Sequence, residues 1–501
     1  MTLRGTAVAA AILLVGSLVS SGALAWGPHT EITRAALDAV HATDAAEDWR
    51  EAFGEENLDA LTRFCWLPDQ QGHDLGSFYA DDYLLFPALP YHVNHVMPHV
   101  VESFAPCFHR SLQALRTETS VNASRHLGTL LHFVEDAGAP PHAKERCPHH
   151  YELENWLPAD QIAIPGYRPR LLGATDEKAL AGFEDRMAAL IAYSAERAEQ
   201  ALPLVEAEDG RAQVEPIILE AALESARVSA DVLYTMFTLG LATQPPGAGL
   251  AGTVTAAEIP LRNDHGARIV LLGTDYTTLA VTAEGESAGS GWQGSYAFRN
   301  LPAGTYRVLA YRTASQVQVS DPVTLRTGEV TRLDFSLRPT EPAGNLVQNP
   351  DGSLEYLLSG TEGRPAVKED MHPPGAAHVR GPHALAAGRS MLPPSEQMVD
   401  RWRYRSDDPG PRWTSDMIHV HPGVTYRCGA VVHDESVRVR FQFHAASLPR
   451  DTDAARRELA TGTHPAELRH TATENHQAAF VIVETDRPLA EAIERVWVVP
   501  E

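Results

Sequence analysis

The stretch His132-Phe-Val-Glu-Asp136-Ala-Gly-Ala-Pro-Pro-His142 carries the strongest structural signal in this 501-residue chain. His132 and Asp136 lie four residues apart in an apolar run, so we expect a buried helix that presents both side chains on one face. The glycine and prolines within residues 138–141 should end that helix, because proline cannot continue its backbone hydrogen bonding. His142 should then arrive from a loop at the helix end and add a third potential metal ligand.

His150 and Glu154 repeat the four-residue spacing a few residues later. A second helix would therefore present an imidazole and a carboxylate to the same cavity, and both groups are common zinc ligands. Any one of the 23 histidines could be an ordinary surface or core residue. Here histidine and carboxylate repeatedly share a helical face in an apolar setting, which penalises charge. The pattern as a whole therefore indicates a metal site.

The first 25 residues are typical of a secretory signal peptide. They combine a short polar start containing Arg4, an apolar run over residues 7–19 and a small-residue ending in Ala23-Leu-Ala25. The apolar run is too short for a transmembrane anchor. We therefore expect cleavage after Ala25 and a secreted protein, either extracellular or periplasmic.

Cleavage at that point would make Trp26 the first residue of the mature chain. Its free amine and its carbonyl oxygen could then close a five-membered chelate on a metal ion. His29 lies just beyond, at the start of a segment in which apolar residues recur at helical spacing. This segment predicts a helix with His29 at its beginning.

These features together resemble the zinc-dependent phospholipase C family, which is related to the fungal single-strand-specific zinc nucleases. The shared pattern is a tryptophan at the mature terminus, a nearby histidine, then H-x3-D-x5-H and H-x3-E, within residues 26–243. The family fold is nearly all helical and holds three zinc ions in one cleft. The resemblance implies that Asp136 bridges two ions. It implies as zinc ligands Trp26, His29, His132, Asp136, His142, His150 and Glu154.

The family also has a further aspartate and a further histidine between the first helix and His132. The Trp-Leu-Pro-Asp69 segment resembles the Pro-Asp element of the toxin branch, so Asp69 is the expected ligand. By the same resemblance Asp69 orients or deprotonates the attacking water. The histidine is His92 or His95, and His92 fits slightly better because Asn94 lies near the point where relatives carry aspartate.

The chain is acidic, with a net charge of −24. Residues 26–243 contain 15 Lys and Arg against 34 Asp and Glu, a balance of −19. Such a surface would attract a polyanionic duplex weakly, whereas zinc ions would focus positive potential in the cleft. The charge therefore makes nucleic acid a less favoured substrate than a phospholipid.

Four cysteines are present, at positions 65, 107, 147 and 428. An exported protein meets oxidising conditions, so we expect one disulfide among the first three. The sequence leaves its pairing open.

Two long periodic runs, at residues 186–202 and 217–239, predict further helices, and a Pro- and Gly-rich linker begins at Pro245. Residues 250–340 then alternate as strands and resemble the carboxypeptidase-regulatory-like domains, which are small β-sandwiches. A turn is expected at residues 300–304. The expected core of this domain comprises Tyr296, Phe298, Tyr306 and Val308.

Residues 341–501 resemble a jelly-roll module of the carbohydrate-binding type, with alternating strand periodicity. Trp402, Tyr404 and Trp413 could stack on a sugar, but aromatic residues in a β-sandwich more often form its core, and we expect core here. The predicted fold class is thus a multidomain chain. An all-α zinc phospholipase C-like catalytic domain (26–243) follows the signal peptide (1–25) and precedes two β-sandwich domains (250–340 and 341–501).

The expected function is hydrolysis of a phosphodiester, such as a phospholipid, by zinc-activated water, with up to three zinc ions. One alternative is a single-strand-specific zinc nuclease on the same scaffold, although Glu154 favours the phospholipase because the nuclease branch commonly has aspartate there. The other is an exported protein with structural zinc, whose β-domains contact glycans or cell surfaces.

Overall fold

The structure is a computed structural model of the full chain. It describes residues 27–69, 95–97, 99–144, 147–242, 244–257, 266–274, 276–280, 292–312, 314–347, 349–353, 366–367, 397–399, 402–405, 410–415, 418–444, 455–459, 466–473, 476 and 478–501. The predicted signal peptide lies outside the described residues and remains a prediction.

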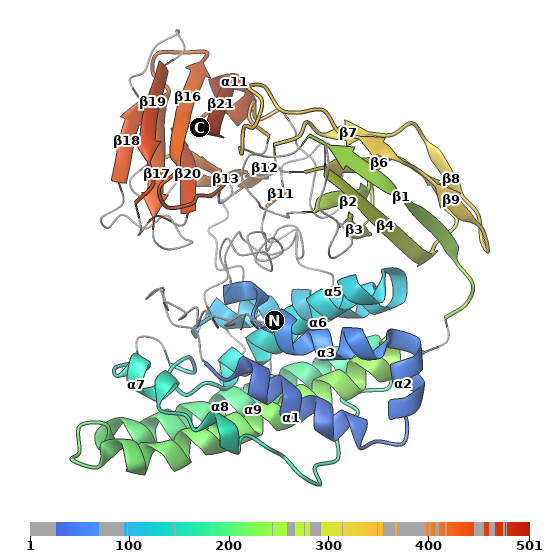
Figure 1. Ribbon diagram of the computed structural model, residues 1–501, viewed down its shortest axis with the longest axis vertical. Coiled ribbons are helices and arrows are strands. Elements are labelled where there is room, and N and C mark those ends of the chain that lie inside the picture. Colours follow the sequence, from blue (N-terminus) through green and yellow to red (C-terminus); the bar gives the residue numbers. More distant parts are fainter. Residues whose placement is uncertain are drawn as a thin grey trace, which may run out of the picture.

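The amino-terminal part is helical, and its longest helices run side by side (Figure 1). The α-helices are α1 (His29–His41), α2 (Ala46–Phe53), α3 (Glu55–Phe64), α5 (Phe104–Thr117), α6 (Ser120–Gly138), α7 (His150–Asn155), α8 (Asp176–Ala201) and α9 (Gly210–Gly240). Short 3-10 helices are η1 (Leu67–Asp69), η2 (His99–Ser103), η3 (Ala159–Gln161) and η4 (Leu202–Leu204). The last helix contacts α1, α5, α6 and α8 and so closes the bundle.

Helix α6 lies at the centre of this bundle. Its residues from Asn122 to Gly138 are all buried, and it packs against α3, α5, α8 and α9. The Thr119 side chain caps its first turn by accepting a hydrogen bond from the backbone N–H of Asn122. The helix ends at Gly138, as the following prolines predict. A charged or polar side chain on α6 is therefore held deep inside the protein.

The middle part of the chain is a small β-structure. Its strands are β1 (Ala248–Ala256), β2 (Ala267–Leu271), β3 (Thr277–Ala280), β4 (Trp292–Leu301), β5 (Gly304–Tyr306), β6 (Val308–Tyr311), β7 (Gln318–Val319), β8 (Val323–Leu325), β9 (Val330–Arg332) and β10 (Phe335–Ser336). One sheet has the order β10-β1-β4, with β9 also on β1, and another the order β3-β2-β6-β7. Inward residues of both sheets form one apolar core.

The predicted core and turn of this part agree with the structure. Tyr296, Phe298 and Val308 are buried and Tyr306 is partly buried against them. The chain turns after Asn300, whose φ is 56°. The strands around the turn do not pair with each other, because β4 pairs with β1 and β5 pairs with β8.

The helical part and the middle β-part share an interface with an apolar and a polar component. Leu279, Leu309 and Tyr311 belong to the core of the helical part. Glu118 is buried, forms an ion pair with Arg110, and accepts a hydrogen bond from Thr278 Oγ1 at 2.5 Å. The two parts are therefore joined by buried side chains.

His126 lies within the same interface and is fully buried. Burial first, then the charges of Arg110, Arg125 and Arg268, hold the pKa of His126 well below its usual value. Glu118 Oε1 lies 3.7 Å from His126 Nε2. The imidazole of His126 is thus favoured in its neutral form.

The carboxyl-terminal part contains two facing sheets. Its elements are β11 (Ala366–Val367), β12 (Gln397–Val399), β13 (Trp402–Arg405), β14 (Arg412–Ser415), β15 (Ile418–His419), β16 (Thr425–Val432), β17 (Arg438–His444), β18 (Ala455–Leu459), β19 (Ala466–Thr471), β20 (Ala478–Glu484), α11 (Leu489–Ala492) and β21 (Ile493–Pro500). The larger sheet has the order β11-β12-β13-β14-β20-β17-β18, with β15 also on β20, and the smaller has the order β19-β16-β21. Tyr426 of β16 and Phe443 of β17 lie in one core between them.

Trp402 and Trp413 are core residues, as expected. Both are buried, and their indole N–H groups donate to the carbonyl oxygens of Asn349 and Arg487 at 3.0 and 2.9 Å. Neither ring is therefore available as a platform for a sugar. The side chain of Tyr404 lies outside the described residues.

The order of one helical part followed by two β-parts confirms the predicted fold class. The exact domain boundaries remain predictions. The expectation of a disulfide is wrong, because the four cysteines are all buried and form no disulfide in the described residues. No helix in the described ranges combines the length and the apolar character needed to cross a membrane.

Candidate metal centre

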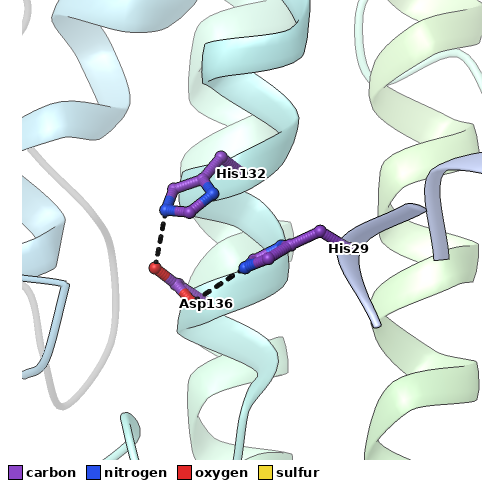
Figure 2. Close-up of side chains that lie close together, drawn as sticks. All are labelled: His29, His132 and Asp136. Carbon is purple, nitrogen blue, oxygen red and sulfur yellow. Dashed lines mark ion pairs between the residues drawn. The ribbon is translucent and has the colours of Figure 1, made fainter. Parts of the chain in front are cut away.

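Three helices and two loops bring the candidate ligands together. His132 and Asp136 project from the same face of α6, and His29, the first residue of α1, points at Asp136 from the neighbouring helix (Figure 2). His95 lies in the short described segment before η2. We call His29, His95, His132 and Asp136 the His29 cluster.

The distances in the His29 cluster all converge on one carboxylate. Asp136 Oδ2 lies 2.7 Å from His95 Nδ1 and 3.0 Å from His132 Nε2, and Oδ1 lies 3.6 Å from His29 Nε2. The His29 and His132 rings are stacked with centroids 4.3 Å apart. His29, His132 and Asp136 are completely buried, whereas the His95 side chain is 13% exposed. One buried carboxylate is thus surrounded by imidazoles.

The hydrogen bond made by His132 Nδ1 defines what its other nitrogen can do. Nδ1 lies 2.7 Å from the carbonyl oxygen of Cys65, which can only accept, so Nδ1 carries a proton. In the neutral ring, Nε2 then has only a lone pair, and this lone pair faces Asp136. Two acceptors at 3.0 Å repel each other unless a proton or a metal cation lies between them.

A second group of candidate ligands comprises His142, His150 and Glu154, which we call the His142 cluster. Both His142 Nε2 and His150 Nε2 lie 2.9 Å from the same oxygen of Glu154, Oε1. His150 and Glu154 are four residues apart on α7, as predicted, and His142 lies on the loop that follows α6. His150 is the most solvent-exposed candidate ligand in the described part of the chain, at 37% of its side chain.

The two clusters are continuous through Asp136. His142 Nδ1 lies 3.1 Å from Asp136 Oδ1, on the opposite side of the ring from Glu154. The carbonyl oxygen of His142 also accepts a hydrogen bond from the backbone N–H of Met97 at 2.8 Å. The loops that carry His95 and His142 are therefore tied together beside α6.

The electrostatics favour an ionised Asp136. Burial by itself would raise the pKa of Asp136, but His132, His142 and His95 hold it well below its usual value. Burial would likewise lower the pKa of His142, but Asp136 and Glu154 raise it to about 10. In the metal-free protein a proton on His142 therefore supplies the positive charge between the two carboxylates.

The donor set fits a transition metal such as zinc. In the described residues, neither oxygen of Asp136 nor Nδ1 of His142 makes a hydrogen bond of acceptable angle, although imidazole nitrogens lie 2.7 to 3.1 Å from that carboxylate. Two ligands of a tetrahedral zinc ion lie roughly 3.3 Å apart, which falls between the 3.1 Å from His142 Nδ1 and the 3.6 Å from His29 Nε2 to Asp136 Oδ1. Each cluster also contains three ligand atoms within 4.8 Å of one another.

The remaining predicted ligands are only partly within the described residues. Trp26 and His92 lie outside them, so both stay predictions. The backbone of Asp69 ends η1, while its side chain lies outside the described residues. Cys65 and Trp66, just before η1, contact His132 and His29, so the chain leading to Asp69 runs beside the cluster.

Two contributors were not predicted from the sequence. Glu135 is fully buried beside Asp136, and its Oε2 lies 2.7 Å from His29 Nδ1. Burial raises the pKa of Glu135 well above its usual value, although a hydrogen bond from Thr33 opposes the shift. The sequence pattern that could have pointed to Glu135 is a second carboxylate within the apolar run around His132. The carbonyl of Cys65 could not have been found, because backbone groups leave no trace in a sequence pattern.

No family model matches this chain, and no curated protein matches it in sequence. Among solved structures, the alpha-toxin of Clostridium perfringens from an avian strain aligns with a TM-score of 0.32 and 12% identity, over 60% of this chain and 97% of the toxin. The alpha toxin of Clostridium absonum aligns with a TM-score of 0.32 and 13% identity, over 60% of this chain and 93% of that toxin. A protein of Bacteroides uniformis described as carbohydrate binding aligns with a TM-score of 0.16 and 10% identity, over 51% of this chain and 100% of that protein. At these scores the likenesses are too weak to support an activity.

Proposed function

We propose that the helical part is a zinc-dependent phosphodiester hydrolase of the phospholipase C type, acting on a phospholipid or a related phosphodiester. The observation that carries this proposal is the position of Asp136, a buried carboxylate that joins the His29 cluster to the His142 cluster. A structural zinc site needs only one closed set of ligands, whereas two adjoining sets are typical of hydrolytic centres.

Each cluster would hold one ion. His29, His132 and Asp136, with His95 beside them, would bind the first, and His142, His150 and Glu154 the second. A third ion would require Trp26 and Asp69, which we propose on the family resemblance alone. Bound zinc supplies Lewis acidity toward phosphoryl oxygens and lowers the pKa of water to near 7.

The protein's own groups prepare the site for this chemistry. The carbonyl of Cys65 holds the proton of His132 on Nδ1, so that Nε2 keeps its lone pair. Glu154 aligns two imidazoles through one oxygen. We propose that Asp69 orients the attacking water or accepts its proton. In the described residues the ligand nearest to solvent is His150, so substrate would approach from that side.

The charge of the helical part supports a lipid rather than a nucleic acid substrate. Residues 26–243 have a balance of −19, which repels a polyanion of many phosphates much more than a single headgroup diester. We extend the proposal to export of the protein, on the basis of residues 1–25, and to glycan or surface contact by the carboxyl-terminal part.

The decisive experiment compares two substrates with the purified mature protein, which begins at Trp26 after removal of the predicted signal peptide. Zinc content is measured first, then hydrolysis of a chromogenic phosphocholine diester and of single-stranded DNA, each with chelator and after zinc is restored. We expect about two or three zinc ions and chelator-sensitive cleavage of the diester. Cleavage of the DNA alone would indicate a nuclease. Bound zinc without cleavage of either substrate would favour the alternative of an exported protein with structural zinc.

A matched pair of variants on α7 tests the assignment of the ligands. Glu154→Gln removes the carboxylate shared by His142 and His150 and should lower diester hydrolysis by at least about 100-fold. Glu152→Gln changes a partly exposed carboxylate on the same helix, and its activity should match the wild type. Equal activities for the two variants would refute the assignment.

A further inference from the structure

Glu135 forms a chain of contacts that ends at the His29 cluster. Its Oε2 lies 2.7 Å from Nδ1 of His29, and its Oε1 accepts a hydrogen bond from Thr33 Oγ1 at 2.7 Å. Thr33 is one helical turn after His29 on α1, and Glu135 immediately precedes Asp136 on α6. All of these side chains are buried.

Keeping a carboxylate at this depth is expensive. Moving an ionised carboxylate out of water costs several kcal/mol even after relaxation, and one hydrogen bond from a hydroxyl does not offset that cost. In the described residues the contacts of Glu135 are a hydroxyl and an imidazole, not an Arg or Lys. A cation on the far side of the imidazole would offset this cost and stabilise the ionised form of Glu135.

The two nitrogens of His29 have opposite tasks if that cation is zinc. Nε2 faces Asp136 Oδ1 and must present a lone pair to the metal, so the ring proton must lie on Nδ1. Glu135 Oε2 is placed to accept that proton. A carboxylate in this position fixes the tautomer, orients the ring and makes the coordinating nitrogen a stronger donor.

We propose that Glu135 is a positioning residue that holds His29 as a metal ligand, with Thr33 holding Glu135 in turn. The inference rests on the proposed zinc function. It adds a second carboxylate of α6 to the site, one that acts through His29 rather than on the metal. His132 has a neutral partner in the same role, the carbonyl of Cys65, so the two imidazoles of the cluster are held by different groups.

The test is zinc binding by the metal-free mature protein, which begins at Trp26, measured by competition with a chromophoric chelator. His29→Ala identifies the binding step that belongs to the His29 cluster, and His150→Asn the step that belongs to the His142 cluster. Glu135→Gln keeps the shape of the side chain but removes its charge. We expect it to weaken only the His29 step, by about 10- to 100-fold.

Two further variants separate positioning from general destabilisation. In a His29→Ala background, Glu135→Gln should cause no additional loss of zinc affinity, because the two residues act through one contact. Thr33→Val should weaken the same step about fivefold, which keeps the inference testable if Glu135→Gln folds poorly. Glu118→Gln, another buried carboxylate of the bundle, should leave both zinc steps unchanged.

The results distinguish this inference from the function on which it rests. A wild-type chain that binds no zinc would overturn both. Normal zinc binding by the wild type, with unchanged affinities in Glu135→Gln and Thr33→Val, would overturn only the role of Glu135. Equal weakening of both zinc steps would also overturn it, because a positioning contact acts on one site.

Discussion

Replacing Gly128 with alanine should damage the proposed metal centre, although the added methyl group would meet Phe64 rather than a candidate ligand. Gly128 lies on α6, one turn before His132, where α3 crosses closely. A Cβ atom at this position would lie 2.5 Å from the carbonyl carbon of Phe64 and 2.6 Å from its Cβ. Ordinary contact begins at 3.4 Å, so the two helices must separate by about 0.9 Å.

That displacement would break the hydrogen bond that holds His132. The carbonyl of Cys65, the residue after Phe64, accepts from His132 Nδ1 at 2.7 Å, and the same shift would open this distance to about 3.6 Å, beyond hydrogen-bonding range. Overpacking costs about 1–3 kcal/mol, and the better helix propensity of alanine returns about 1 kcal/mol. We expect a net loss of up to about 2 kcal/mol in stability and a 10- to 100-fold loss of zinc affinity at the His29 cluster.

The assay is zinc competition together with thermal unfolding of the metal-free protein. Gly240→Ala is the control, because its Cβ would also overpack, at 2.6 Å from Cδ1 and 2.7 Å from Cβ of Leu115, but on α5, which carries no candidate ligand. It should bind zinc like the wild type. Wild-type zinc affinity in Gly128→Ala would show that the close approach of α3 and α6 does not position His132.

Three further predictions concern the pH dependence of stability, the buried carboxylate of Asp231 and the removal of zinc. Burial, and then the charges of Arg110, Arg125 and Arg268, hold the pKa of His126 in the folded protein well below 6.5. The unfolded chain therefore binds a proton on this histidine at a higher pH than the folded protein does. The free energy of unfolding should fall as pH drops below about 6.5, by up to about 1.4 kcal/mol per pH unit. His126→Gln should flatten that part of a pH series of denaturant titrations, and an unchanged slope would contradict the assignment. Asp231→Asn should destabilise the bundle by about 2–3 kcal/mol in chemical denaturation. The reason is that the buried carboxylate accepts hydrogen bonds from Tyr167 Oη at 2.8 Å and Arg186 Nε at 3.1 Å. Equal denaturation midpoints for the variant and the wild type would refute this. Removing zinc with a chelator should lower the free energy of unfolding by about 2.7 kcal/mol, compared with protein in free zinc at 100 times the zinc Kd. Scanning calorimetry measures the effect. An unchanged unfolding temperature would mean that the folded state binds no zinc.

The sequence by itself determined the local parts of the site. His132 with Asp136, and His150 with Glu154, share helical faces because residues four apart always do so on an α-helix. The end of α6 at Gly138 and the burial of Trp402 in a strand core were predictable for the same reason, since turn chemistry and strand alternation are encoded within a few residues.

Only the tertiary structure decided which of these local elements meet. It places His29 and His142 near the same oxygen of Asp136 and brings His95 to 2.7 Å from the other, although neither His29 nor His95 is near that carboxylate in sequence. The sequence left His92 and His95 as alternatives, and His92 lies outside the described residues. Spacing along a chain reports only which side chains share an element. The approach of separate elements depends on how their surfaces fit.

Glu135 and Gly128 illustrate this limit most clearly. A sequence contains a carboxylate next to a ligand and a glycine within a helix, but it does not say that the first touches His29 or that the second lets Phe64 approach. Both roles depend on partners that are more than 60 residues away in the chain. Close packing in three dimensions creates these contacts, because the interior tolerates few voids and a buried charge needs a partner.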